Sequence, residues 1–291
     1  MLGEPALALL NKLAALRDGP VIELGPYIGG STIALASGAR ADVITVEIGG
    51  ANAGHDAIPS ADIIADLRRN LDKAGLSDRV AVVDGHFRSP AALEAVERLL
   101  RGRRAGLVFV DVHPGTEIAL SLYARFLAED AFVVVDDYSS EIAREKAAQV
   151  RAFVDRAVAG GIMREIGVFG WGTWFGGLEP GGRPRLSALP TPLPCVREGG
   201  HCWHVYVGHE DAADDRSGNA SPLLLFEDGR AVGPPHSLHA EIREKGGGRY
   251  SHWRGYLWFS TSDNSDPRSN GRRYIARVGG HEIDLARGPL S

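Results

Sequence analysis

The chain has 291 residues, of which 44% are hydrophobic and 24% are charged, as in ordinary globular proteins. This length allows one large domain or two modest domains, each with its own core. Acidic residues outnumber lysine and arginine by 37 to 32, so the composition argues against a basic face for nucleic acid. No apolar run approaches the roughly 18 residues that a membrane span needs. The N-terminus lacks a secretory pattern and the two cysteines are too few for a disulfide scaffold, so we expect a cytoplasmic protein with no membrane partner.

Short apolar runs alternate with helical patterns over the first 180 residues. Leucines at helical spacing predict a helix within residues 1–19, and further helices are predicted over 61–74 and 91–101. Five strands are predicted between and after them, at Val21–Leu24, Val43–Val46, Val80–Val83, Leu107–Val110 and Phe132–Val135. Continuously apolar strands separated by helices indicate a parallel sheet buried on both faces. Ligands of such sheets bind beyond the carboxyl ends of the strands.

A hairpin is predicted to close this sheet. After a helix over residues 141–159, apolar runs at Ile162–Phe169 and Gly172–Phe175 flank a Gly-Trp-Gly turn. We therefore predict an α/β fold with a mostly parallel, seven-stranded sheet, occupying residues 1–180.

The remaining residues differ in composition. Residues 181–200 are rich in glycine and proline and are predicted to form a linker. Residues 201–291 are predicted to form a smaller β-rich domain, with strands at Trp203–Val207, Leu223–Phe226, Tyr256–Ser260 and Tyr274–Val278. Its density of Trp, Tyr, His, Asp and Asn suits a carbohydrate-binding surface. The alternative is a module that packs on the first domain or forms a homodimer, with its aromatic side chains in the core.

A glycine-rich turn follows the first strand. In VIELGPYIGGST, the glycines allow a tight turn and close approach of a ligand, and the helix beginning near Ser31 points free N–H groups at it. The G-x-G-x-x-G pattern of dinucleotide sites is broken after Gly25 by Pro26 and Tyr27. Glu47, at the end of the second strand, can accept both ribose hydroxyls. The combination favours an adenosyl ligand without a pyrophosphate.

The stretch ELGPYIGGST resembles the first motif of class I S-adenosylmethionine (SAM)-dependent methyltransferases, closely that of the catechol O-methyltransferase group. DGHFRSP resembles the corresponding stretch of macrocin-type sugar O-methyltransferases. The resemblance covers residues 1 to about 177 and implies a Rossmann-like methyltransferase fold. The resemblance places Gly25, Tyr27 and Ser31 around the methionine end of SAM and Glu47 on the ribose. It places Asp84, Gly85 and His86 beside the adenine. The full set implied to bind the cofactor also includes Glu23, Gly29 and Asp111.

Three carboxylates lie at the tips of neighbouring predicted strands. Asp111 ends the fourth strand, and Asp136 and Asp137 end the fifth. Because adjacent strands are about 5 Å apart, these tips converge, and a bound cation relieves the repulsion between them. An all-oxygen site suits Mg²⁺ or another divalent cation. The alternative is that one aspartate caps a helix and another faces solvent. The metal-dependent O-methyltransferases that the chain resembles use acidic residues at these positions.

His113 lies two residues beyond Asp111 and is the predicted general base, because an imidazole titrates near neutral pH. The alternative is an exposed or merely ligand-contacting histidine. We therefore predict a metal-dependent O-methyltransferase that uses SAM to methylate a hydroxyl of a small molecule, such as a sugar, a glycosylated natural product or a polysaccharide precursor. Two other functions remain open: a nicotinamide-dependent oxidoreductase, and a glycan-binding protein with a methyltransferase scaffold.

Overall fold

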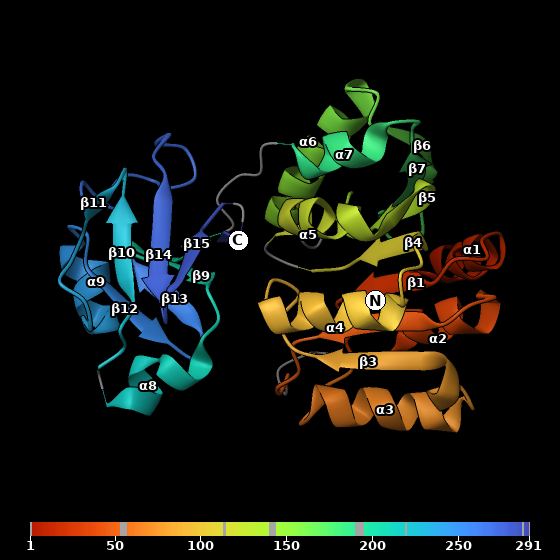
Figure 1. Ribbon diagram of the computed structural model, residues 1–291, viewed down its shortest axis with the longest axis horizontal. Helices are drawn as coiled ribbons and strands as arrows, with labels where there is room; N and C mark the ends of the chain where they lie inside the picture. The colour runs from red at the N-terminus through yellow and green to blue at the C-terminus, as the bar shows by residue number, and fades with distance from the viewer. Residues whose placement is uncertain are drawn as a thin grey trace. The chain divides into compact units, whose positions relative to one another are not determined.

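The computed structural model describes residues 2–52, 57–112, 115–139, 144–189, 195–218, 220–286 and 288–290. The chain divides into two compact units, Met1–Leu189 and Pro190–Ser291, which are described separately (Figure 1). Within the described part of the chain, no helix is both long and apolar enough to cross a bilayer.

A seven-stranded sheet forms the centre of the first unit. Its strands lie in the order β3-β2-β1-β4-β5-β7-β6. Their bounds are β1 (Val21–Leu24), β2 (Val43–Glu47), β3 (Val80–Asp84), β4 (Ala105–Val110), β5 (Leu127–Val135), β6 (Met163–Phe169) and β7 (Thr173–Leu178). The first five strands pair in parallel, and β7 runs antiparallel between β5 and β6. The predicted Rossmann-like sheet with a closing hairpin is confirmed.

Helices cover both faces of this sheet (Figure 1). They are α1 (Glu4–Ala15), α2 (Gly30–Gly38), α3 (Ile63–Lys73), α4 (Pro90–Leu100), α5 (Thr116–Tyr123), α6 (Arg144–Ala159) and α7 (Gly182–Ser187), with 3-10 turns η1 (Ser77–Arg79) and η2 (Ala124–Phe126). Successive strand residues point to opposite faces. Thus Val21 joins a core with α1, α2 and α3, whereas Ile22 joins a core with α4, α5 and α6. Both faces of the central strands are buried, which explains why a strand such as β4 is continuously apolar.

Two antiparallel sheets make up the second unit, in the orders β11-β10-β14-β15-β16 and β12-β13-β9-β8. Both sheets contribute to one hydrophobic core, for example through Leu257 of β13 and Ala276 of β14. The strands are β8 (Val196–Gly199), β9 (Cys202–Tyr206), β10 (Leu224–Glu227), β11 (Arg230–Ala231), β12 (Tyr250–Trp253), β13 (Tyr256–Phe259), β14 (Tyr274–Val278), β15 (His281–Asp284) and β16 (Gly288–Leu290). Short helices are η3 (Glu210–Ala212), α8 (Asp214–Ser217) and α9 (His239–Lys245).

The predicted linker over residues 181–200 is too long. Its first part forms α7, whose Leu186 is fully buried in a core of the first unit. Its last part forms β8, which pairs with β9 in the second unit. Glycine and proline content concealed both elements, because each one is short and contributes few apolar side chains.

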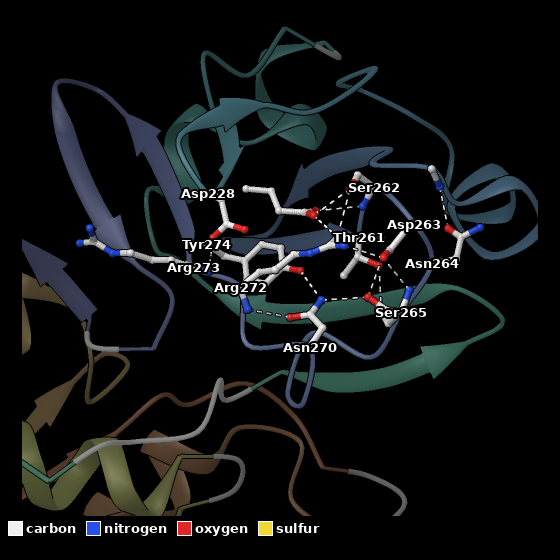
Figure 2. A network of polar contacts seen from close by, with 12 residues as sticks. Asp228, Thr261, Ser262, Asp263, Asn264, Ser265, Asn270, Arg272, Arg273 and Tyr274 are labelled. Atoms are coloured by element: carbon white, nitrogen blue, oxygen red, sulfur yellow. Dashed lines mark hydrogen bonds and ion pairs between the residues drawn. The ribbon is translucent and has the colours of Figure 1, made fainter.

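A polar network fixes the long connection between β13 and β14 (Figure 2). Arg272 lies at its centre and pairs with the buried Glu227 of β10 and with Asp263 of the connection. The Ser262 hydroxyl also donates to Glu227, over 2.7 Å. Hydrogen bonds from Ser265, together with Arg272, hold the pKa of Asp263 below its ordinary value. The Asp and Asn residues of this loop therefore have a structural role, because their side chains take part in the hydrogen bonds and ion pairs that hold the loop.

Candidate functional site

The carboxyl ends of the parallel strands meet at one edge of the first unit. The chain keeps its ladder hydrogen bonds for one residue beyond each strand: Gly25 N–H donates to Val46, Asp111 N–H to Leu24, and Asp136 N–H to Val110, over 2.9–3.0 Å. Residues that follow β1, β4 and β5 are therefore held in register with one another. This register brings the predicted site residues together.

Gly25 is required where it stands. Its φ is +82°, and a Cβ there would lie 2.1 Å from the carbonyl oxygen of Asp111. Gly29 also has a left-handed φ, +95°, at the start of α2. At Gly30, by contrast, a Cβ would meet no atom within 4 Å. The turn is thus closed towards β4 and open at the first residue of α2, where helix N–H groups lack intrahelical partners.

Glu47 has a fixed orientation at the end of β2. One carboxylate oxygen accepts the backbone N–H of Tyr27 at 2.9 Å, and the other accepts that of Gly49 at 3.1 Å. Burial raises the pKa of Glu47, and the backbone donors oppose that shift. Each oxygen can accept a second hydrogen bond. The side chain is therefore suited to the ribose hydroxyls predicted for it.

Glu23 lies deeper than the sequence indicated, with no exposed surface. It accepts hydrogen bonds from the hydroxyls of Thr32, at 2.7 Å, and Thr45, at 3.0 Å. Burial raises its pKa to about 7, although hydroxyls including that of Ser31 oppose the shift. Glu23 therefore links β1 and β2 to the first turn of α2. Its predicted contact with the cofactor stays a prediction.

The stretch after β3 borders the same edge. Gly85 N–H donates to the carbonyl of Glu47 at 2.8 Å, which holds the stretch beside the end of β2. The His86 ring stacks on Phe87, with ring centroids 4.5 Å apart, and its Nδ1 accepts the N–H of Arg88. Burial, followed by the charge of Arg88, lowers the pKa of His86 well below its ordinary value. The ring is therefore neutral at pH 7. Asp84, the last residue of β3, is exposed.

The three predicted metal ligands converge. Carboxylate oxygens of Asp111, Asp136 and Asp137 all lie within 4.8 Å of one another. Two oxygens on opposite sides of Mg²⁺ are separated by about 4.2 Å, twice the metal–oxygen distance. Burial, and then the charge of Asp111, raises the pKa of Asp136. Charging Asp136 is therefore costly here, and the three carboxylates are close enough together, and of the right donor type, to be candidate ligands of a divalent cation.

Two further features orient the pair at the end of β5. Asp137 has a left-handed φ of +58°, which turns the chain directly after Asp136. If the strand continued in extended form, the side chains of Asp136 and Asp137 would point to opposite faces of the sheet. The left-handed turn at Asp137 departs from that alternation. The hydroxyl of Thr173, on β7, donates to Asp136 at 2.6 Å. The sequence carries no local signal for this contact, because Thr173 belongs to the closing hairpin. The predicted base, His113, lies outside the described residues.

Residues 22–138 match the model of a family described as a methyltransferase domain. Over these residues, which are fewer than half of the chain, the first unit is similar to methyltransferase domains. This confirms the resemblance seen in the sequence, and with it the expectation of a SAM-dependent methyltransferase. The match includes the glycine turn, Glu47 and all three aspartates, and it does not extend into the second unit.

Three solved structures are similar. An O-methyltransferase from Bacillus cereus, in complex with SAH, has 18% identity and a TM-score of 0.45, covering 60% of this chain and 80% of its own. Cofactor-bound Rv0187 from MTB has 25% identity and a TM-score of 0.45, covering 60% and 79%. TomG from Streptomyces achromogenes, an O-methyltransferase involved in tomaymycin synthesis and in complex with SAM, has 21% identity and a TM-score of 0.46, covering 62% and 81%. No curated protein matches the sequence.

Proposed function

We propose that this chain transfers the methyl group of SAM to a hydroxyl group of a small molecule, with a divalent cation held by Asp111, Asp136 and Asp137. The observation that carries the proposal is the convergence of these three carboxylates within 4.8 Å at the edge where the glycine turn lies. A domain that served only as a scaffold has no need of three converging carboxylates, one of them buried. Mg²⁺ is the proposed ion, because all three ligands are carboxylate oxygens.

The residues that would bind SAM lie around the ends of β1, β2 and β3. Glu47 offers two fixed carboxylate oxygens to the ribose, and the first turn of α2 is open beside Gly30. The neutral ring of His86 provides a flat surface for the adenine. These are the roles that the sequence resemblance implies for these residues.

The cation, when bound, would supply a Lewis acid that lowers the pKa of the acceptor hydroxyl. The three aspartates would fix its position, and Thr173 would fix Asp136. His113 is the proposed base that removes the hydroxyl proton. Much of the acceleration would come from holding the acceptor oxygen in line with the methyl group.

The proposed acceptor is a sugar or a glycosylated molecule. The macrocin-like motif after β3 and the aromatic, polar composition of the second unit support this choice. A cytoplasmic location and a homodimer also stay proposals.

Calorimetric titration of the full chain with SAM and with NAD tests the cofactor. We expect SAM to bind and NAD not to bind; binding of NAD alone would favour the nicotinamide-dependent oxidoreductase. Asp136→Ala is expected to abolish methyl transfer and Mg²⁺-dependent thermal stabilisation, while SAM affinity stays within about threefold. The matched control is Asp78→Ala, at an exposed position in η1. Full activity of Asp136→Ala, or of the wild type in excess chelator, would refute the metal's role.

A further inference from the structure

A cavity of about 340 Å³ lies in the second unit, which the methyltransferase match does not reach. Its wall comes from three segments: the start of α8, the residues that lead into α9, and β12. The polar and aromatic lining residues are Asp214, His236, Ser237, His239, Ser251 and Trp253. The volume is in the range of small-molecule sites in proteins.

Asp214 is a buried, fixed carboxylate in this wall, with 3% of its surface exposed. One oxygen accepts the N–H of Ser221 at 3.0 Å and Nδ1 of His236 at 2.7 Å. The other accepts the N–H of His252 at 3.0 Å. These three donors hold the carboxylate in one orientation. With Nδ1 of His236 directed at Asp214, the ring's Nε2 is the nitrogen left to meet a ligand.

A second histidine is fixed from the side of the sheet. Nε2 of His239 lies 3.1 Å from the hydroxyl of Ser251. The His239 ring stacks on Trp258, with ring centroids 4.3 Å apart, and meets Trp253 edge to face at 6.0 Å. Trp253 itself keeps 37% of its surface exposed. The cavity therefore combines rigid hydrogen-bonding groups with an accessible indole.

The lining residues also exclude several ligand classes. They include no lysine or arginine, so a phosphate, sulfate or carboxylate ligand would find no fixed positive counter-charge. A purely apolar ligand would cover this polar lining without forming any hydrogen bond to it, which is unfavourable. A sugar ring suits this lining, because its hydroxyl groups can donate to Nε2 of His236 while its apolar C–H groups pack against the exposed indole of Trp253.

We propose that the cavity between α8, α9 and β12 binds a neutral saccharide. The inference deepens the proposed saccharide acceptor and rests on that proposal for its biological purpose. Binding itself requires neither SAM nor a metal ion. The site gives the second unit a function in holding a glycan chain or glycosylated acceptor.

The test is saturation-transfer NMR on the full chain, without SAM or metal. The probes are glucose, galactose, mannose, rhamnose and N-acetylglucosamine, their disaccharides, and glucuronic acid and inorganic phosphate as anionic comparisons. We expect at least one neutral saccharide to bind. Its affinity should fall at least tenfold in Trp253→Ala and in His239→Phe, which keeps an aromatic ring against Trp258 but removes the hydrogen bond. Trp171→Ala is the matched control, since Trp171 is 64% exposed in the first unit.

Any of the following results would overturn the proposal: no neutral saccharide of the panel binds, the anionic probes bind more tightly, or both cavity variants bind as the wild type does. Loss of saccharide binding in Asp136→Ala but not in Trp253→Ala would also overturn it, because the sugar would then occupy the first unit. Circular dichroism of each variant checks folding. Since SAM binding is measured separately, its failure would refute the proposed methyl transfer and not the saccharide site.

Discussion

Replacing Glu23 by glutamine is expected to stabilise the first unit at pH 8 and to leave its stability at pH 4 nearly unchanged. Burial raises the pKa of Glu23 from its ordinary 4.5 to about 7. Between these values the folded protein retains a proton that the unfolded chain releases, so rising pH lowers the stability of the wild type. At about 1.4 kcal/mol per pH unit, the loss is about 3 kcal/mol and is complete above pH 7. Glutamine cannot ionise and keeps an oxygen for Thr32 and Thr45.

The measurement is urea unfolding of the full chain between pH 4 and 8, followed by hydrogen exchange of peptides from β1 and β4. These peptides report the first unit separately from the second. The matched control is Glu97→Gln, on the exposed face of α4, which should follow the wild-type curve. Parallel curves for Glu23→Gln and the wild type over the whole range would refute the reasoning. The same outcome would mean that the hydroxyls around Glu23 fully compensate for its burial.

Three other substitutions probe the site. Gly25→Ala should destabilise the first unit by more than about 2 kcal/mol and weaken SAM binding, because it combines left-handed backbone strain with a clash against Asp111. Gly50 has a similar φ of +85°, but a Cβ there would meet open space. Chemical unfolding of Gly25→Ala and Gly50→Ala therefore separates the effect of strain from the effect of the clash. Glu47→Gln should weaken SAM binding by about 10- to 100-fold in calorimetry, as expected for losing a charged hydrogen-bond acceptor, and unchanged affinity would remove Glu47 from the ribose site. Thr173→Val should lower Mg²⁺ affinity in thermal-shift titrations without changing SAM affinity, and equal Mg²⁺ affinity would show that Asp136 needs no support from β7.

The first unit was predictable because its central strands, such as β1 and β4, are buried on both faces. Such strands give uninterrupted apolar runs, as in Leu107–Val110, whichever neighbours they pair with. The second unit was predicted less completely. Its strand Tyr250–Trp253 and helix His239–Lys245 carry polar and charged residues, so the apolar pattern missed them although the core beside them is well packed. Short elements of mixed composition depend on tertiary contacts that one sequence does not reveal.

The candidate site shows the same division. Its three carboxylates were predictable from position, since each follows a strand and neighbouring strands end at one edge. The burial of Glu23 was not, because a residue's depth depends on the helices that cover the sheet. The cavity of the second unit was beyond prediction, since Asp214, His236 and Ser251 belong to separate segments with no common motif.

The left-handed backbone at Asp137 limits which residues this position accepts. Asparagine and aspartate adopt positive φ more readily than other residues with a side chain. Both carry an oxygen at the same distance from the backbone, whereas glutamate extends one carbon further. Asp137→Asn therefore removes one negative charge while keeping an oxygen in place. At the proposed cation site, this substitution would change the net charge of the three ligands without changing their number or reach.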